Sequence, residues 1–363
     1  MTEIMKLNKP WLVAVWPGMG NVALSAGYYM ISKLGMHLLA EFSPKELFEM
    51  EHVEVKDGLI HPGRLPRSRL FVWTDPQHQH DVIVFIGEAQ PPTGKYQFCH
   101  SLIDLARRLG VERVFTFAAM ATQMHPEHVS RVFGAATEEQ GLEQLKSLDI
   151  DLLQEGQISG LNGVLLGVAA ESGLRGTCLL GEMPHIFAQL PFPKAALAVV
   201  RVFSSIADIE IDTHELVEQA RIMDRNLGQL LSKVEEAIEK SRSEEPEEDS
   251  QEFTEESRVE EEERLSAEDE NHIEKLFEQA RQDRTKAYEL KRELDRLEVF
   301  KDYENRFLNL FQKPSSDYPA NPEPDASAFR LIDPVPFPRP LPHITTTRLA
   351  CSSRREIFCR KQP

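Results

Sequence analysis

The stretch GQISGLNGVLLGVAAESGLRGTCLLGEMPHIFAQLPFP, from Gly156 to Pro193, decides the fold. It begins as a glycine-rich turn, continues as a helix of small residues over about 162–171, and turns again at Gly-Leu-Arg-Gly. A short buried strand at 177–180 follows, and a loop punctuated by prolines ends the stretch. Seven glycines permit left-handed turns and close backbone approach, namely Gly156, Gly160, Gly163, Gly167, Gly173, Gly176 and Gly181. The pattern predicts an α/β core that packs tightly against a neighbouring element.

Composition limits the class of protein. The 363 residues are 41% hydrophobic, which is enough for a real core, and the formal net charge is −18. Residues 244–270 hold fifteen acidic side chains against two arginines, so the rest of the chain is only mildly acidic, and no nucleic-acid partner is expected. The four cysteines are too few and too scattered for a disulfide framework, and Cys178 is predicted to be a buried thiol.

The apolar run 11–16 is too short for a signal peptide, and no stretch approaches the roughly 20 apolar residues of a membrane span. We therefore expect a soluble, cytoplasmic protein without a membrane partner.

Strand-like segments alternate with helical ones through the first 212 residues. Continuous or alternating apolar runs predict strands at 11–16, 37–42, 52–60, 69–74, 81–87, 111–118, 129–135 and 177–180. Helices are predicted at 22–34, 96–109, 137–148, 162–171 and 194–207, with capping boxes opening helices at 43–46 and 137–140. The alternation predicts a three-layer α/β domain with a mixed, mostly parallel sheet.

The character of the sequence changes after residue 212. The predicted divisions are an α/β core at 1–212, an amphipathic helix at 213–240, an acidic linker at 241–270, a helical extension at 271–313, and a disordered, proline-rich and basic tail at 314–363. The extension is predicted to be an antiparallel helix pair or one bent helix. Docking on its own core is favoured over an exposed coiled coil.

Several short motifs have the residue types of a binding or catalytic site. The turn Gly18-Met19-Gly20-Asn21 follows a strand and precedes a helix, which suits a phosphate, but position 23 is Ala and a plain tight turn is favoured. Glu88 follows a strand at the carboxyl edge of the sheet, where it is either catalytic or structural, and the structural role is favoured. His78 and His80 are interpreted as surface residues on a turn. His125 and His128 resemble a metal motif only loosely, because Pro126 interrupts the helix and there is no third ligand, so no metal site is expected.

Five motifs in order resemble the proteasome assembly chaperone family, the group of the second eukaryotic assembly chaperone, which has many prokaryotic members. They are Trp16-Pro-Gly-Met-Gly-Asn, Gly87-Glu-Ala-Gln-Pro, Gly156-Gln-Ile-Ser-Gly-Leu-Asn-Gly, Cys178-Leu-Leu-Gly-Glu-Met-Pro-His and Pro191-Phe-Pro-Lys-Ala-Ala. The resemblance covers about 11–212, and the segment from Ala287 to Leu308 is similar to the carboxyl-terminal extension of some prokaryotic members.

The resemblance implies a phosphorylase/hydrolase-like core, a tendency to form homo-oligomers, and binding of proteasome subunits or a related protein without catalysis or a cofactor. Proteasome-binding members carry a terminal hydrophobic-Tyr-X tripeptide, whereas this sequence ends Lys361-Gln362-Pro363, which argues against docking by that route.

Two functions remain open from the sequence. In the first, loops at the carboxyl edge form a partner surface. In the second, a nucleotide-binding enzyme similar to ATP-grasp ligases or to phosphorylases and hydrolases binds an anion on these loops, with Glu88 or Glu182 acting on a proton or metal. The candidate residues for either site are Gly18, Met19, Gly20, Asn21, Glu88, Pro91, Ser159, Gly160, Asn162, Glu182, Met183, Pro184 and His185. One deep polar pocket would favour the enzyme, and a flat apolar surface would favour the chaperone.

Overall fold

The computed structural model describes residues 7–42, 47–48, 53–56, 58–243, 265–312 and 329–331. Its main sheet has the strand order β11-β2-β5-β6-β1-β7-β10-β8-β9. The four central strands run parallel to one another, and they are β6 (Val82–Gly87), β1 (Trp11–Val15), β7 (Arg113–Thr122) and β10 (Arg175–Pro184). Their apolar runs are buried because helices cover both faces of the sheet.

Antiparallel strands flank this parallel centre on both sides. The outer strands are β2 (His37–Phe42), β5 (Ser68–Trp73), β8 (Val132–Ala136), β9 (Asp151–Leu152) and β11 (Phe329–Leu331). β5, β2 and β11 pair in antiparallel succession outward from β6, β8 pairs antiparallel with β10, and β9 is parallel to β8. The sheet is therefore mixed, as the sequence predicted.

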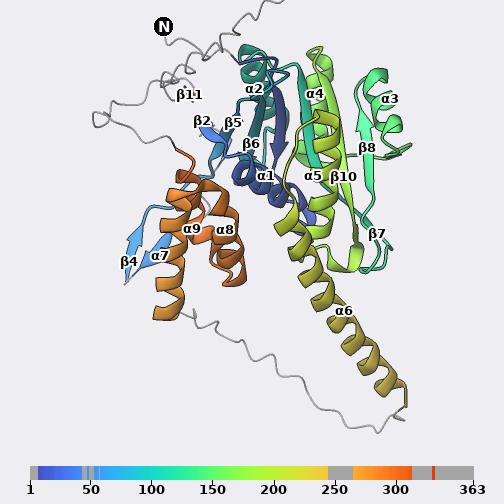
Figure 1. Ribbon diagram of the computed structural model, residues 1–363, viewed down its shortest axis with the longest axis vertical. Helices are drawn as coiled ribbons and strands as arrows, with labels where there is room; N and C mark the ends of the chain where they lie inside the picture. The colour runs from blue at the N-terminus through green and yellow to red at the C-terminus, as the bar shows by residue number, and fades with distance from the viewer. Residues whose placement is uncertain are drawn as a thin grey trace, which may run out of the picture.

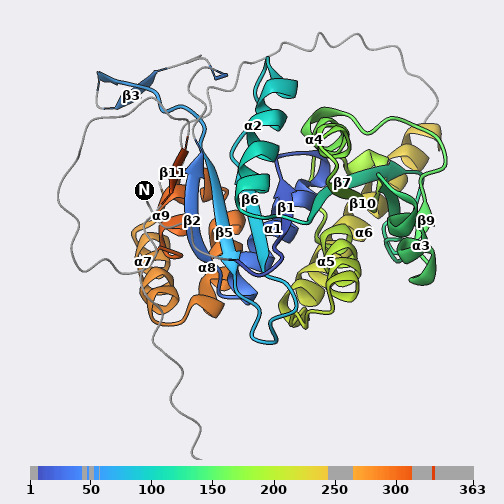
Figure 2. The same ribbon diagram turned by 90° about the horizontal axis from the view of Figure 1, so that it is seen from above.

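The helices form the two outer layers (Figure 2). One face is covered by α2 (Lys95–Arg108) and α4 (Gly160–Glu171), and the other by α1 (Val22–Lys33), α3 (Glu139–Ser147) and α5 (Pro193–Ala207). This arrangement confirms the predicted three-layer α/β class.

The glycine-rich stretch allows the layers to pack closely. A Cβ atom on Gly181 of β10 would lie 2.6 Å from the backbone carbonyl oxygen of Ala195 on α5. A Cβ on Gly163 in α4 would lie 1.8 Å from the carbonyl oxygen of Ile158. A larger side chain at Gly181 would force α5 away from the sheet, and one at Gly163 would displace the turn that precedes α4. Cys178 lies between these layers, where burial raises the pKa of its thiol to about 11.

Among the described residues after the core, α6 is followed by the helices of the extension, α7 to α9 (Figure 1). These helices are α6 (His214–Ser243), α7 (Ala267–Gln282), α8 (Ala287–Arg296) and α9 (Phe300–Asn309). In the extension, Phe300 and Phe307 pack edge-on against Tyr28 of α1, and Tyr288 packs against Tyr29. The extension thus docks on the core, which is the arrangement that the sequence favoured. None of the described helices is long and apolar enough to cross a membrane.

The structure corrects several sequence predictions. The single strand predicted at 52–60 is a hairpin of β3 (Glu54–Lys56) and β4 (Leu59–His61), which Gly58 turns with a φ of 78°. The extension has three helices where one or two were predicted, because Glu298, with a φ of 59°, ends α8 and redirects the chain. Helix α3 is capped by Glu138, whose carboxylate accepts the Gly141 N–H, and not by Thr137.

Other predictions were displaced or lie outside the described residues. The strand predicted from residue 129 begins at Val132, and His80, interpreted as a surface residue, is buried against Trp11. The helix start at 43–46 and most of the acidic linker lie outside the described residues. Within the tail, only 329–331 are described, and they form β11 where no strand was predicted.

Candidate functional site at the carboxyl edge

The four parallel strands end at one edge of the sheet, and the loops that follow them are joined by hydrogen bonds. The Gly20 N–H donates to the carbonyl oxygen of Ala188 at 2.9 Å, and the Phe192 N–H donates to that of Gly20 at 2.9 Å. His185 Nδ1 lies 3.1 Å from the carbonyl oxygen of Thr122. The loops after β1, β7 and β10 therefore form one connected surface.

The Gly-x-Gly turn is a packing feature of this edge. Gly20 has a φ of 60° and Asn21 a φ of 48°. A Cβ on Gly20 would lie 2.7 Å from the sulfur of Met183, which packs directly beneath the turn. The N–H groups of Gly20 and Asn21 already donate within the protein, the second to the carbonyl oxygen of Gly18. The turn therefore does not present them to a phosphate.

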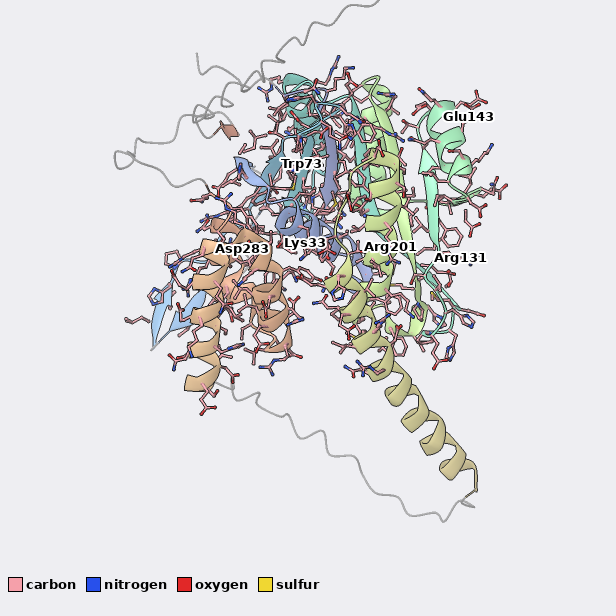
Figure 3. The ribbon with its side chains drawn as sticks, in the orientation of Figure 1. Lys33, Trp73, Arg131, Glu143, Arg201 and Asp283 are labelled. Atoms are coloured by element: carbon pink, nitrogen blue, oxygen red, sulfur yellow. The ribbon has the colours of Figure 1, made fainter. Side chains whose placement is uncertain are left out.

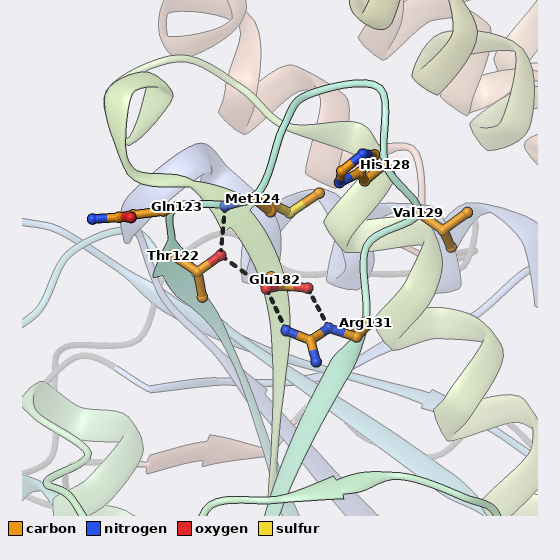
Figure 4. A pocket seen from close by; sticks show the side chains of 7 residues that line it. All are labelled: Thr122, Gln123, Met124, His128, Val129, Arg131 and Glu182. Carbon is orange, nitrogen blue, oxygen red and sulfur yellow. Dashed lines mark hydrogen bonds and ion pairs between the residues drawn. The ribbon is translucent and has the colours of Figure 1, made fainter.

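Glu182 lies at the centre of a shallow pocket of about 460 Å³ (Figure 4). Its carboxylate accepts from Arg131 Nε at 2.8 Å, from Arg131 Nη2 at 2.9 Å and from the Thr122 hydroxyl at 2.8 Å. These bonds, led by that from Arg131, hold the pKa of the Glu182 carboxyl below its usual value. The remaining lining residues are Gln123, Met124, His128 and Val129. The carboxylate is ionised and accepts three hydrogen bonds from the protein, so it joins β10 to the ends of β7 and β8.

Glu88 belongs to a separate cluster on the other side of the edge. Its carboxylate accepts from Arg64 Nη1 at 2.8 Å, from Arg69 Nη1 at 3.1 Å and from the Arg67 N–H at 2.9 Å. Arg69, which is 1% exposed, also pairs with Glu41 and donates to Asn305 of α9 at 2.6 Å. Glu88 thus holds the two arginines, Arg64 and Arg69, that donate to Asn305 of the helical extension, which is a structural role.

The residues predicted around the start of α4 form a third group. The Gln90 side chain donates to the Pro17 carbonyl oxygen and accepts from the Leu161 N–H, both at 3.2 Å. Gly160, with a φ of 68°, lies directly against this amide, and Ser159 is the N-cap without a side-chain hydrogen bond. Pro91 and Pro184 are buried, whereas Asn162 is half-buried and its backbone carbonyl oxygen accepts from the Thr116 hydroxyl. The candidate residues therefore divide among three clusters and do not converge on one polar pocket.

The sequence predicted only some of the exposed apolar side chains on these loops. The four that we call the apolar edge are Met19 (45% exposed), Val129 (84%), Ile186 (56%) and Leu190 (41%). Met183, Pro184 and His185 are predicted from the sequence as candidates at this edge, whereas Val129 is placed in a strand. Arg131 and Arg69 were missed because their carboxylates lie 51 and 19 positions away, and no local pattern connects them.

Comparisons with known proteins identify the family and similar folds. A sequence model of the PAC2 family matches residues 12–231. An uncharacterized protein of Methanocaldococcus jannaschii is 27% identical over 257 residues, which are 68% of this chain and 93% of that protein. PbaB of Pyrococcus furiosus, described as an archaeal proteasome activator, is 25% identical with a TM-score of 0.54, over 63% of this chain and 96% of its own. A Mycobacterium tuberculosis proteasome-assembly chaperone homologue shares the fold, with a TM-score of 0.53 and 19% identity over 61% of this chain and 94% of its own.

Proposed function

The chain belongs to the PAC2 family, and we propose that it is a proteasome-assembly-chaperone-like protein that binds other proteins through the apolar edge. In this proposal the core at 1–212 supplies the binding surface, and the extension at 271–313 packs against the other half of the carboxyl edge, around Glu88. The protein works in the cytoplasm and assembles into homo-oligomers. Its partners are proteasome subunits or proteins built like them.

The exposed side chains of the apolar edge are the observation that carries the proposal. Removal of apolar groups from water at an interface favours binding, and each group contributes to the binding free energy in proportion to the area that it buries. Glu182 and the backbone groups of the Gly-x-Gly turn already have partners within the protein. A partner that covers the edge therefore leaves few of the polar groups beneath it without a hydrogen bond.

The kind of partner comes from the relatives. PbaB is described as a proteasome activator, and the M. tuberculosis relative as a proteasome-assembly chaperone homologue. The enzyme alternative draws no support from the described residues, because its two proposed acid–base groups, Glu88 and Glu182, lie in separate clusters and each is held by arginine.

The test is capture of proteasome core-particle subunits from the same organism by the full chain. We expect the wild type to retain these subunits and the double variant Ile186→Asp/Leu190→Asp to retain at least about tenfold less, because buried carboxylates would oppose contact. Ile60→Asp is the matched control, since Ile60 is 73% exposed on β4 and lies outside the apolar edge. Equal capture by the double variant and the wild type would rule out this surface. Failure of the wild type to retain proteasome subunits would rule out this partner.

A further inference from the structure

A second cavity lies at the opposite, amino edge of the sheet, where the parallel strands begin. Its volume is about 480 Å³. Trp11, Arg113 and Arg175 line it, and they are the first residues of β1, β7 and β10. The other lining residues come from α3 and its N-cap, and they are Glu138, Gln140, Gly141, Glu143, Gln144 and Ser147.

Arg113 in this cavity is a buried cation without an anion. It is 5% exposed, and two of its N–H groups find acceptors, Gln144 Oε1 at 2.6 Å and Thr177 Oγ1 at 3.0 Å. Its Nε–H is buried without an acceptor. No carboxylate of the described chain lies within ion-pairing distance of the guanidinium, whereas the other buried cations, Arg69 and Lys291, both pair with carboxylates. A buried charge normally has a partner, because desolvation of an isolated ion is costly.

Two aromatic rings compensate for only part of the hydration that the Arg113 guanidinium loses on burial. The Arg113 guanidinium carbon lies 4.6 Å from the ring centroid of Phe115 and 5.3 Å from that of Trp11, so both rings attract the cation. Trp11 in turn stacks on His80 at 4.0 Å, and burial lowers the pKa of that histidine, so its ring adds no second charge at neutral pH. Burial, with the nearby cation of Arg175, lowers the pKa of Arg113 to about 10. The charged form of Arg113 is therefore only partly compensated, by the two rings and by Glu138 at a distance.

We propose that this cavity binds a small monocarboxylate through the guanidinium of Arg113, with Arg175 as a second cation. The planar guanidinium suits a carboxylate, and the amide of Gln140, which also lines the cavity, supplies a further hydrogen bond to the ligand. Glu138 and Glu143 also line the cavity without an ion pair to either arginine, and their charges disfavour phosphate, which carries more negative charge, relative to a monocarboxylate. The volume lies near the lower end of the range for small-molecule sites, which fits a metabolite and not a folded partner.

Titration of the full chain with acetate, at constant ionic strength, tests the proposal. Tryptophan fluorescence reports on the site because Trp11 lies against the guanidinium, and phosphate in place of acetate distinguishes the class of anion. We expect a saturable response to acetate that is stronger than the response to phosphate. Arg113→Met should abolish the response, and it should fold because it removes a charge that is only partly compensated. Arg201→Met, an exposed position on α5, is the control that keeps the wild-type response.

A second variant keeps the test decisive if Arg113→Met does not fold. Arg175 is half-buried, with its nearest carboxylate oxygen, on Glu112, at 3.7 Å, so Arg175→Gln leaves the interior intact. We expect this variant to bind acetate several-fold more weakly. Absence of a saturable response in the wild type, an unchanged response in Arg113→Met or Arg175→Gln, or a preference for phosphate would each overturn the proposal.

Discussion

The two halves of the carboxyl edge contain the same kind of ion pair, but one half is covered and the other is open to solvent. In each half a glutamate at the end of a central strand is held by an arginine, Glu88 by Arg69 and Glu182 by Arg131. The Glu88 half is covered by α9 of the chain's own extension, while the Glu182 half opens onto solvent among the exposed side chains of the apolar edge. Figure 3 shows Asp283 of the extension and Arg131 on opposite sides of the body.

This difference separates stability from binding along one edge of the sheet. The covered half buries its ions and aromatic rings, so changes there should act mainly on the free energy of unfolding. The open half has exposed side chains and a shallow pocket, so changes there should act mainly on association.

The largest expected effect is on the covered half, from Arg69→Met. This change removes a buried cation that contacts Glu88, Glu41 and Asn305. Loss of one partner of a buried pair costs about 3–5 kcal/mol, and because Arg64 stays paired with Glu88 we expect the lower end, about 3 kcal/mol. The free energy of unfolding, measured by chemical denaturation, should fall by that amount. Arg131→Met in the open half should cost clearly less, because the Arg131 side chain is 59% exposed and Glu182 keeps its bond from Thr122. Equal losses in the two variants would break the comparison.

Phe307→Ala should loosen the extension without disturbing the open half. Phe307 is fully buried against Tyr28, Phe300 and Phe311, and removal of such a ring costs about 3 kcal/mol. Hydrogen exchange should become faster in α1 and in α7–α9, because the docked surfaces separate more often. Exchange in the loop at 123–131 should stay at the wild-type rate. Faster exchange there as well would show that the two halves are coupled.

A smaller effect concerns the pH dependence of the free energy of unfolding, to which the two halves should contribute with opposite signs. Burial raises the pKa of Glu304, which accepts the Tyr28 hydroxyl and lies near Glu88, Arg69 and Arg64. Since the folded state binds this proton more tightly, Glu304 costs stability as pH rises from the unfolded pKa of about 4.3 through the higher folded pKa. Glu182, with a lowered pKa, contributes stability at neutral pH that is lost as pH falls through its folded pKa.

Glu304→Gln should therefore stabilise the protein at pH 7 by about 1 kcal/mol, the scale of one polar substitution, and should remove this decline with rising pH. Denaturant midpoints measured between about pH 3 and pH 7 would show it. A variant that is less stable than the wild type at pH 7 would mean that Tyr28 needs the charged acceptor.

The sequence predicted the strands and helices of the core better than the contacts that distinguish the two halves of the carboxyl edge. Periodicity located β1 and α1 to within one residue, because continuous apolar runs and small-residue helices have local signatures. The contact from Arg69 to Asn305 spans 236 positions, so no local pattern could show that the extension covers Glu88. Glu138 was missed as a cap because Thr137, the better capping residue by type, instead accepts the Gly176 N–H of β10. The sequence indicated residues 183–185 as candidates, but only the fold places Val129 on the same edge.

The most direct test of the central claim is a hydrogen-exchange footprint of the full chain with and without the proteasome core particle. If the apolar edge binds this partner, amides at 18–21, 123–131 and 185–192 should exchange more slowly in the complex, while those in the extension should not change. Protection confined to the extension or to the β3–β4 hairpin, with the apolar edge unchanged, would contradict the account.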